Sequence, residues 1–236
     1  MTMSRPIFAQ WRLGIALLAS SLVSLVLFAA GALRNHSLAY DYLLYNLALA
    51  WIPLLMAVLL AWLLRRRLWS SWLPLLATVI WLGFLPNSFY MISDYIHLQD
   101  VTRLDVLSDV LMFSSFILNA FVLGLLSLGI VHGELRKRFR ARSSWVLVLG
   151  VILVTSFAIY IGRDLRWNTW DLLLNPASVL FDVSDRLLSP AAHPEMLSTT
   201  LGFAVLITTF YTMAHQATQR GTAALFYSRN PPIVRE

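Results

Sequence analysis

Six long runs of apolar residues follow one another along the chain, separated by short polar segments. Each run holds 18 to 22 residues, with no Asp, Glu, Lys or Arg in its interior. A helix needs about 20 residues to cross the hydrocarbon core of a bilayer, whereas strands of a membrane barrel are about half as long and alternate in polarity. The pattern therefore predicts an all-α bundle of six transmembrane helices, over 13–33, 43–64, 68–85, 110–131, 145–162 and 196–214.

The charged residues divide unequally between the two sides of these helices. With the first residue on the cytoplasmic side, 13 of the 18 Lys and Arg residues lie in cytoplasmic segments, and 10 of the 12 acidic residues lie in outer segments. Because cytoplasmic loops carry an excess of Lys and Arg, we expect a protein of the cytoplasmic membrane with both termini inside. We expect one transmembrane domain over 1–219 and a short cytoplasmic tail over 220–236.

The first apolar run also resembles a cleavable signal peptide, because it follows Arg5 and Arg12 and ends in small residues. The apolar core of a signal peptide holds about 7–15 residues. This run holds 21, so we expect it to remain as the first transmembrane helix.

Composition supports the membrane interpretation and excludes several kinds of chemistry. Hydrophobic residues make up 58% of the chain and charged residues 13%, against about 45–50% and 25% in soluble domains. The chain has no cysteine, which excludes disulfides and thiolate sites. The net charge of +6 follows from topology, and the basic runs 65–67 and 136–140 are suited to anionic lipids at the inner face. We expect no nucleic-acid partner, and the sequence requires no cofactor.

A few polar residues and prolines interrupt the apolar runs. Asn46 and Asn119 are the most polar side chains inside the predicted helices and can hydrogen-bond to neighbouring helices. Pro53 and Pro86 predict kinks, which are either ordinary bends or the broken helices of a small carrier for a neutral substrate. Ionisable groups are missing from the bilayer centre, which disfavours a proton-coupled pump.

Two polar segments leave the third and fifth helices on the predicted outer side, over 81–98 and 158–171. Asp94 and His97 are three residues apart, so they share a face of a helix. They can form a hydrogen-bonded interfacial pair, a proton-transfer pair, or two ligands of a metal that needs a third. With Asp109, which opens the fourth helix on the same side, they are the candidate catalytic residues.

The second outer segment combines arginines with tryptophans. Arg163 and Arg166 can bind a phosphate or carboxylate through two hydrogen bonds each. Trp167 and Trp170 either stack on a sugar or headgroup or anchor the chain at the membrane surface. The candidate ligand-binding residues are Asn87, Arg163, Arg166, Trp167, Asn168, Trp170 and Asp171.

The stretch 176–190 is amphipathic. On a helix it places Val179, Leu180, Val183 and Leu187 on one face and its charged residues elsewhere. This pattern is typical of a helix that lies on a membrane. We expect it to lie beside the outer polar segments and to cover them.

These segments resemble the DUF1361 family of multi-pass bacterial membrane proteins. The resemblance rests on residues 46–53, on 81–98 with its Pro-Asn and Asp-x-x-His core, on Asp109 opening a helix, and on Gly-Arg-x-x-Arg-Trp-Asn-x-Trp-Asp over 162–171. It covers residues 40–215. Asp164 stands where the family usually has an apolar residue, so a shared role for it is not implied. The family implies this fold and supplies no activity.

Three functions fit the sequence. The first is a structural or assembly subunit of the cell envelope that docks a protein partner through its outer motifs. The second is an outer site that binds or modifies an anionic lipid headgroup or an envelope-linked substrate. The third is a neutral-substrate carrier whose path is lined by Asn46, Pro53, Pro86 and Asn119.

Overall fold

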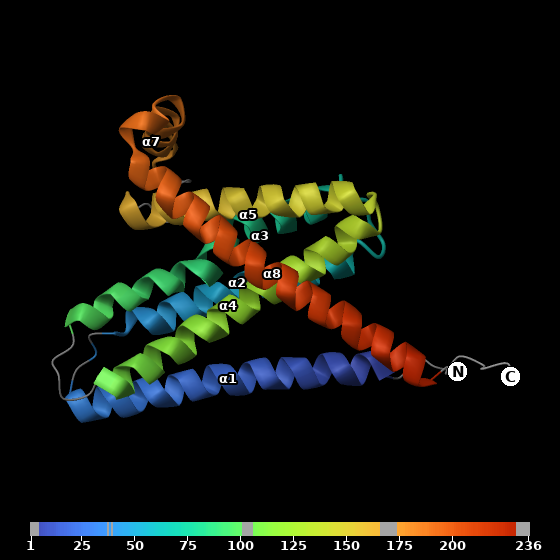
Figure 1. Ribbon diagram of the computed structural model, residues 1–236, viewed down its shortest axis with the longest axis horizontal. Helices are drawn as coiled ribbons and strands as arrows, with labels where there is room; N and C mark the ends of the chain where they lie inside the picture. The colour runs from blue at the N-terminus through green and yellow to red at the C-terminus, as the bar shows by residue number, and fades with distance from the viewer. Residues whose placement is uncertain (1–4, 37, 39, 101–105, 166–173, 230–236) are drawn as a thin grey trace, which may run out of the picture.

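In a computed structural model of the protein, the long helices extend along the bundle, while the shorter helix over 176–188 runs across it (Figure 1). The structure describes residues 5–229 except 37, 39, 101–105 and 166–173. These residues form seven α-helices and two 3-10 helices, with no β-strand among them, so the all-α prediction is confirmed. In chain order they are α1 (Arg5–Asn35), α2 (Tyr42–Leu63), α3 (Trp72–Tyr90), η1 (Met91–Asp100), α4 (Val106–Arg136), α5 (Ala141–Asp164), α7 (Pro176–Leu188), η2 (Pro190–Ala192) and α8 (Pro194–Arg229).

Six helices in the described residues are long and apolar enough to cross a membrane, and they coincide with the six predicted runs. The protein is a multi-pass membrane protein. Helix α3 begins at Trp72, four residues later than the pattern predicts, because the preceding residues turn and Ser71 is extended, with φ −70° and ψ 148°. Helix α8 continues to Arg229, past residue 219, where we expect the transmembrane domain to end.

The bundle has two distinct ends. At one end, on the left of Figure 1, lie the end of α1, η1, the start of α4 and the end of α5, together with α7. We call this the Asp94 end. At the opposite end, which we call the His132 end, α1 begins and α8 finishes (Figure 1). Both outer segments singled out in the sequence leave their helices at the Asp94 end.

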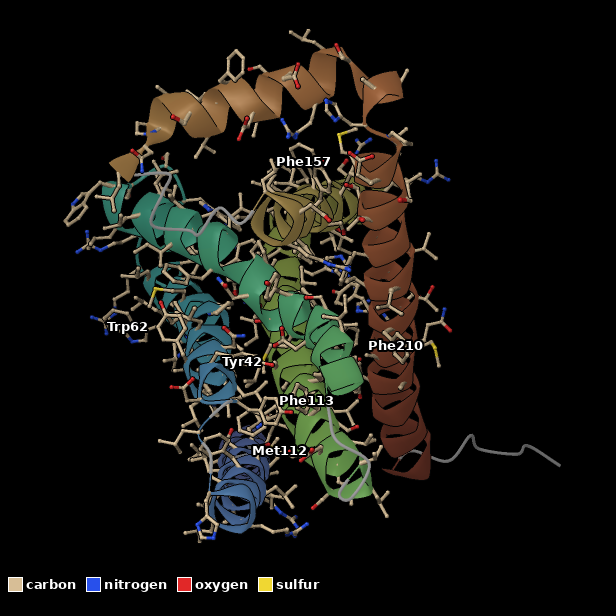
Figure 2. All side chains as sticks on the ribbon, turned by 90° about the vertical axis from the view of Figure 1, so that its left-hand side faces the viewer. Tyr42, Trp62, Met112, Phe113, Phe157 and Phe210 are labelled. Atoms are coloured by element: carbon tan, nitrogen blue, oxygen red, sulfur yellow. The ribbon has the colours of Figure 1, made fainter. Side chains whose placement is uncertain are left out.

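Helix α4 forms the centre of the packing. Phe113 and Phe116 belong to an apolar cluster with residues of α1, α2 and η1, and Figure 2 shows Met112 and Phe113 near α1 and α2. Further along, Leu128 and Val131 belong to a second cluster with residues of α3, α5 and α8. Helix α4 therefore joins the two halves of the bundle.

A glycine allows α3 to approach α4 closely. A methyl group at Gly124 would lie 2.7 Å from Cζ of Phe89 and 2.9 Å from Cβ of Ser88. Both neighbours are fully buried, and the Ser88 hydroxyl donates to the Ala50 carbonyl of α2 (3.2 Å). Only glycine fits at position 124 without displacing the aromatic ring.

Asn119 joins three helices in the middle of the membrane. Its Nδ2 donates to Ser21 Oγ of α1 (2.9 Å), and its Oδ1 accepts from Ser20 Oγ (3.2 Å). The indole of Trp51 on α2 donates to the same Ser21 oxygen (3.1 Å). These contacts confirm the prediction that Asn119 hydrogen-bonds to a neighbouring helix.

Candidate functional site

The Asp94 carboxylate is buried at the junction of η1 and α2. Its side chain is 3% exposed, and Asn46 Nδ2 of α2 donates to its Oδ2 at 3.2 Å. The buried Met91 at the start of η1 packs in the cluster that holds Met112 and Phe113 of α4, which positions the 3-10 helix. Burying even a neutral polar group without a hydrogen-bond partner costs about 2–7 kcal/mol, and burying a charged group costs more. A buried carboxylate therefore needs such donors. The prediction for Asn46 is thereby confirmed as well.

Tyr90 is the last residue of α3 and lies four residues before Asp94. Ser93, between Tyr90 and Asp94 in sequence, donates its hydroxyl to the Tyr90 carbonyl (2.7 Å) and so stabilises the change from α3 to η1. The end of α3 is thereby joined to the segment that carries Asp94.

Asp109 is a second buried carboxylate at this end. It is 4% exposed and lies in the first turn of α4, where the helix dipole favours a negative charge. Its neighbour Ser108 accepts a hydrogen bond from Arg34 Nη1 at the end of α1 (2.9 Å). On the next turns, Ser114 Oγ hydrogen-bonds to the Tyr95 hydroxyl of η1 (3.0 Å). The start of α4 is thus tied to both α1 and η1.

The remaining candidates divide into described and undescribed residues. Arg163 is exposed in the last turn of α5. The Asn87 amide donates to the Phe84 carbonyl of its own helix (3.3 Å), which engages one of its donors within α3. Five of the ligand-binding candidates lie in the segment 166–173, outside the described residues: Arg166, Trp167, Asn168, Trp170 and Asp171. The side chain of His97 is also outside the part of the chain that the structure describes.

The described residues at the Asp94 end include groups suited to anion binding and to proton transfer. Within this part of the chain, no three His, Asp or Glu side chains converge as metal ligands would. An exposed arginine can bind an oxyanion, while a buried carboxylate held by an amide can orient or accept a proton from a bound group. We take Asn46, Tyr90, Asp94, Asp109 and Arg163, which all belong to the Asp94 end, as the candidate site; the contact that joins two of them is the hydrogen bond from Asn46 to Asp94.

A second polar cluster, which the sequence analysis did not identify, lies at the His132 end. His132 of α4 is 1% exposed; its Nδ1 lies 2.6 Å from the Tyr211 hydroxyl of α8, and its Nε2 lies 3.4 Å from Ser144 Oγ of α5. His215 stacks on His132 with ring centroids 5.1 Å apart, and Trp145 meets both imidazoles edge-on.

Both nitrogens of His132 are therefore engaged by hydroxyl groups, and Nε2 of His215 lies 2.8 Å from Nε2 of Gln219. Stacked imidazoles do not point their nitrogens at a common centre, which is unsuitable for a shared metal. The cluster joins α4, α5 and α8, and we assign it a structural role. The spacing of Tyr211 and His215, four residues apart on one face of a helix, is the signal that could have identified it.

Comparison with known proteins places the candidate site within a family. Neither a curated protein nor a solved structure matches the chain. The model of a family described as "Protein of unknown function (DUF1361)" matches residues 45–213. The match covers more than half of the chain and includes Asn46, Tyr90, Asp94, Asp109 and Arg163, the five described residues of the candidate site. The chain belongs to the DUF1361 family.

Proposed function

We propose that the Asp94 end is an outward-facing site that binds an anionic group of the cell envelope, either a lipid headgroup or an envelope-linked phosphate or carboxylate. The observation that supports it best is the burial of two carboxylates, Asp94 and Asp109, at one end of an apolar bundle. Buried ionisable groups in membrane proteins are costly and usually functional. A merely structural bundle could use uncharged residues there at lower cost.

The division of labour follows from exposure and charge. Arg163 is exposed and planar, so it would hold the anion through paired hydrogen bonds. Asp94 is buried and held by Asn46, so it would orient the bound group or accept a proton from it. Tyr90, at the end of α3 and four residues before Asp94, would be a further hydrogen-bonding group for the ligand.

The two other functions expected from the sequence receive less support. The carrier requires a path lined by Asn46, Pro53, Pro86 and Asn119, but the two amides bond to neighbouring helices and Pro53 is buried. An assembly subunit needs a docking surface for a protein, and no single contact in the described residues favours one. Assembly is therefore the interpretation left if the binding experiment fails.

The proposal includes the orientation. The distribution of Lys and Arg favours the Asp94 end outside the cytoplasmic membrane and both termini inside. Because the chain has no cysteine, a single cysteine at exposed Ser178 of α7 should react with an impermeant maleimide in intact cells. A cysteine in the exposed segment 65–67 should react only after lysis. The reverse pattern would contradict the orientation.

Binding can be tested by thermal unfolding of the purified protein. In phosphatidylcholine nanodiscs containing phosphatidylglycerol, the protein should unfold at a higher temperature than in phosphatidylcholine alone, because a ligand of the folded state stabilises it. The experiment uses the R65Q/R66Q/R67Q variant as its reference, since these exposed arginines would bind anionic lipid at the opposite end.

In that background, Arg163→Gln should diminish the increase in unfolding temperature, and the part that remains would come from the second basic run, 136–140. Arg34→Gln is the matched control, because Arg34 is also an exposed arginine at the Asp94 end, where it contacts Ser108. Soluble glycerol phosphate distinguishes the ligand sources: protection by it indicates recognition of the phosphate group, and protection only by the lipid indicates a headgroup bound in its bilayer. An undiminished increase in the Arg163→Gln variant would overturn the proposal.

A further inference from the structure

Helix α7 divides into three faces with different surroundings. Val179 is buried and Val183 half-buried on the first face, toward the bundle. Ser178, Asp182 and Asp185 form a polar second face at helical spacing. The third face covers the rest of the helix surface, and most of its residues are apolar. It holds Ala177, Leu180, Phe181, Ser184 and Leu188, all of them exposed.

The first face sets the depth of α7 in the membrane. Val183 packs with Tyr160 and Ile161 of α5 and with Met196 of α8. These three residues lie inside the candidate spans 141–164 and 194–219, not beyond their ends. Figure 1 shows α7 beside the last turns of α5, and Figure 2 shows it running across the edge of the bundle while α5 is seen nearly end-on. Helix α7 therefore runs across the bundle level with the last turns of α5 and the first turn of α8, where a bilayer around the spans would have its boundary.

The polar face is held by ion pairs that also fix the turn into α8. Arg186 Nη1 lies 3.5 Å from Asp182 Oδ1 and 3.7 Å from Asp185 Oδ2. His193, just before α8, places Nε2 3.1 Å from Asp185 Oδ2 and Nδ1 3.5 Å from Glu195 Oε1. Through Asp185 and His193 these contacts join α7 to the start of α8, which holds α7 in its orientation about its own axis.

The remaining face is strongly apolar and strongly exposed. Leu180, Phe181 and Leu188 are 64%, 73% and 83% exposed. Large apolar side chains at the boundary of a bilayer are stabilised by entering the acyl region. The charged residues of α7 are two aspartates and one arginine, so attraction to anionic headgroups would not drive this contact.

From these observations we propose that α7 is a wedge inserted sideways into the outer leaflet, with Leu180, Phe181 and Leu188 in contact with acyl chains and Ser178 and Asp185 in contact with water. The sequence alone places Val179, Leu180, Val183 and Leu187 on one lipid-facing side. In the structure, Val179 is buried and Val183 packs against the bundle, whereas Leu180 is exposed together with Phe181 and Leu188. The partner of this surface is lipid, and the inference is independent of ligand binding at Arg163.

Spin labels on single cysteines test the wedge directly in phosphatidylcholine proteoliposomes. At positions 181 and 188, collisions with oxygen should exceed those with a water-soluble nickel chelate, since oxygen concentrates in acyl chains. At positions 178 and 185 the ratio should reverse. A protein partner or a second copy would instead shield 181 and 188 from both reagents, and exposure to water would favour nickel at all four positions. Either result would overturn the proposal.

A pair of variants separates anchoring from folding. Phe181→Ser with Leu188→Ser should leave the unfolding temperature in detergent unchanged, because both side chains are largely exposed. In proteoliposomes, a spin label at position 180 of the same variant should no longer collide more often with oxygen than with the nickel chelate. Val183→Ser is the matched variant on the bundle side and should lower the unfolding temperature in detergent. An equal loss in detergent for both variants would show that the third face is packed against protein.

Discussion

The two ends of the bundle use buried polar groups in different ways. At the His132 end, an imidazole is enclosed by two hydroxyl groups and two aromatic rings, and its hydrogen-bonding capacity is used within the protein. At the Asp94 end, two carboxylates are buried, one of them on an amide of α2, and an arginine in the last turn of α5 is exposed. The first arrangement joins three helices with uncharged groups, whereas the second keeps charge at the membrane boundary.

The difference separates groups that stabilise the fold from groups that can act on a ligand. A neutral hydrogen-bonded cluster contributes about 1 kcal/mol per bond and rigidity to the bundle. A buried charge contributes little net stability, so its presence needs another explanation. We therefore expect that stability lost by a substitution at the Asp94 end is recovered when the charge is restored. At the His132 end, it should be recovered only when the shape and the hydrogen bonds of the side chain are restored.

The largest effect is expected for Asn46→Asp. This variant would place a second carboxylate against Asp94, whose oxygen now accepts from the amide at 3.2 Å. Two carboxyl groups this close share a proton at low pH and repel each other once both ionise, so at high pH the free energy of unfolding should fall by about 3–5 kcal/mol. Equilibrium unfolding in mixtures of mild detergent and SDS measures the loss.

The exchange variant is the control for charge. Asn46→Asp combined with Asp94→Asn restores one amide and one carboxylate, so it should recover most of the stability. A stable Asn46→Asp single variant would show that the two side chains do not face each other. An unstable exchange variant would show that the geometry, and not the repulsion, is responsible.

The second-largest loss of stability is expected for His132→Ala. The variant would leave a cavity and remove the partner of Tyr211, so the free energy of unfolding should fall by about 2–4 kcal/mol. The control is His193→Ala at the other end, where the imidazole is partly exposed and paired with Asp185; it should cost less than about 1 kcal/mol. Equal losses would remove the distinction between the enclosed and the surface histidine.

The spans could be predicted from the sequence because membrane insertion depends on local composition. A run of about 20 apolar residues is sufficient, whatever its neighbours are. The His132 cluster could not be predicted in this way, because His132 and Tyr211 are 79 residues apart. At the end of a span, an aromatic or histidine residue is equally typical of an interfacial anchor, and only the packing of α8 on α4 separates the two.

The candidate site was predictable in its position and not in its contacts. Topology alone assigns Asp94, Asp109 and Arg163 to one side of the membrane. The bond from Asn46 to Asp94 depends on how α2 packs against η1, and an asparagine within a span can reach any adjacent helix. The faces of α7 show the same limit, since the pattern identifies an amphipathic helix and cannot say which apolar edge meets protein.

The smallest of the three effects is expected for Asn119→Ala, between the two ends. Interhelical hydrogen bonds in membranes average about 0.6 kcal/mol, so losing two should cost about 1 kcal/mol in the SDS unfolding experiment. Ser21→Ala should cost a similar amount, and the double variant less than the sum of the two, because both remove the bond of 2.9 Å. Strict additivity would show that the two side chains act separately.

The close contact at Gly124 determines how far Asp94 lies from the centre of the membrane. The Phe89 ring occupies the notch that this glycine leaves on α4, and η1 begins two residues after Phe89. Sliding α3 along α4 by one helical turn would press the ring against Ala120 or Leu128, where a side chain fills the space. The height of the carboxylate above the bilayer centre is therefore set by one missing methyl group on another helix.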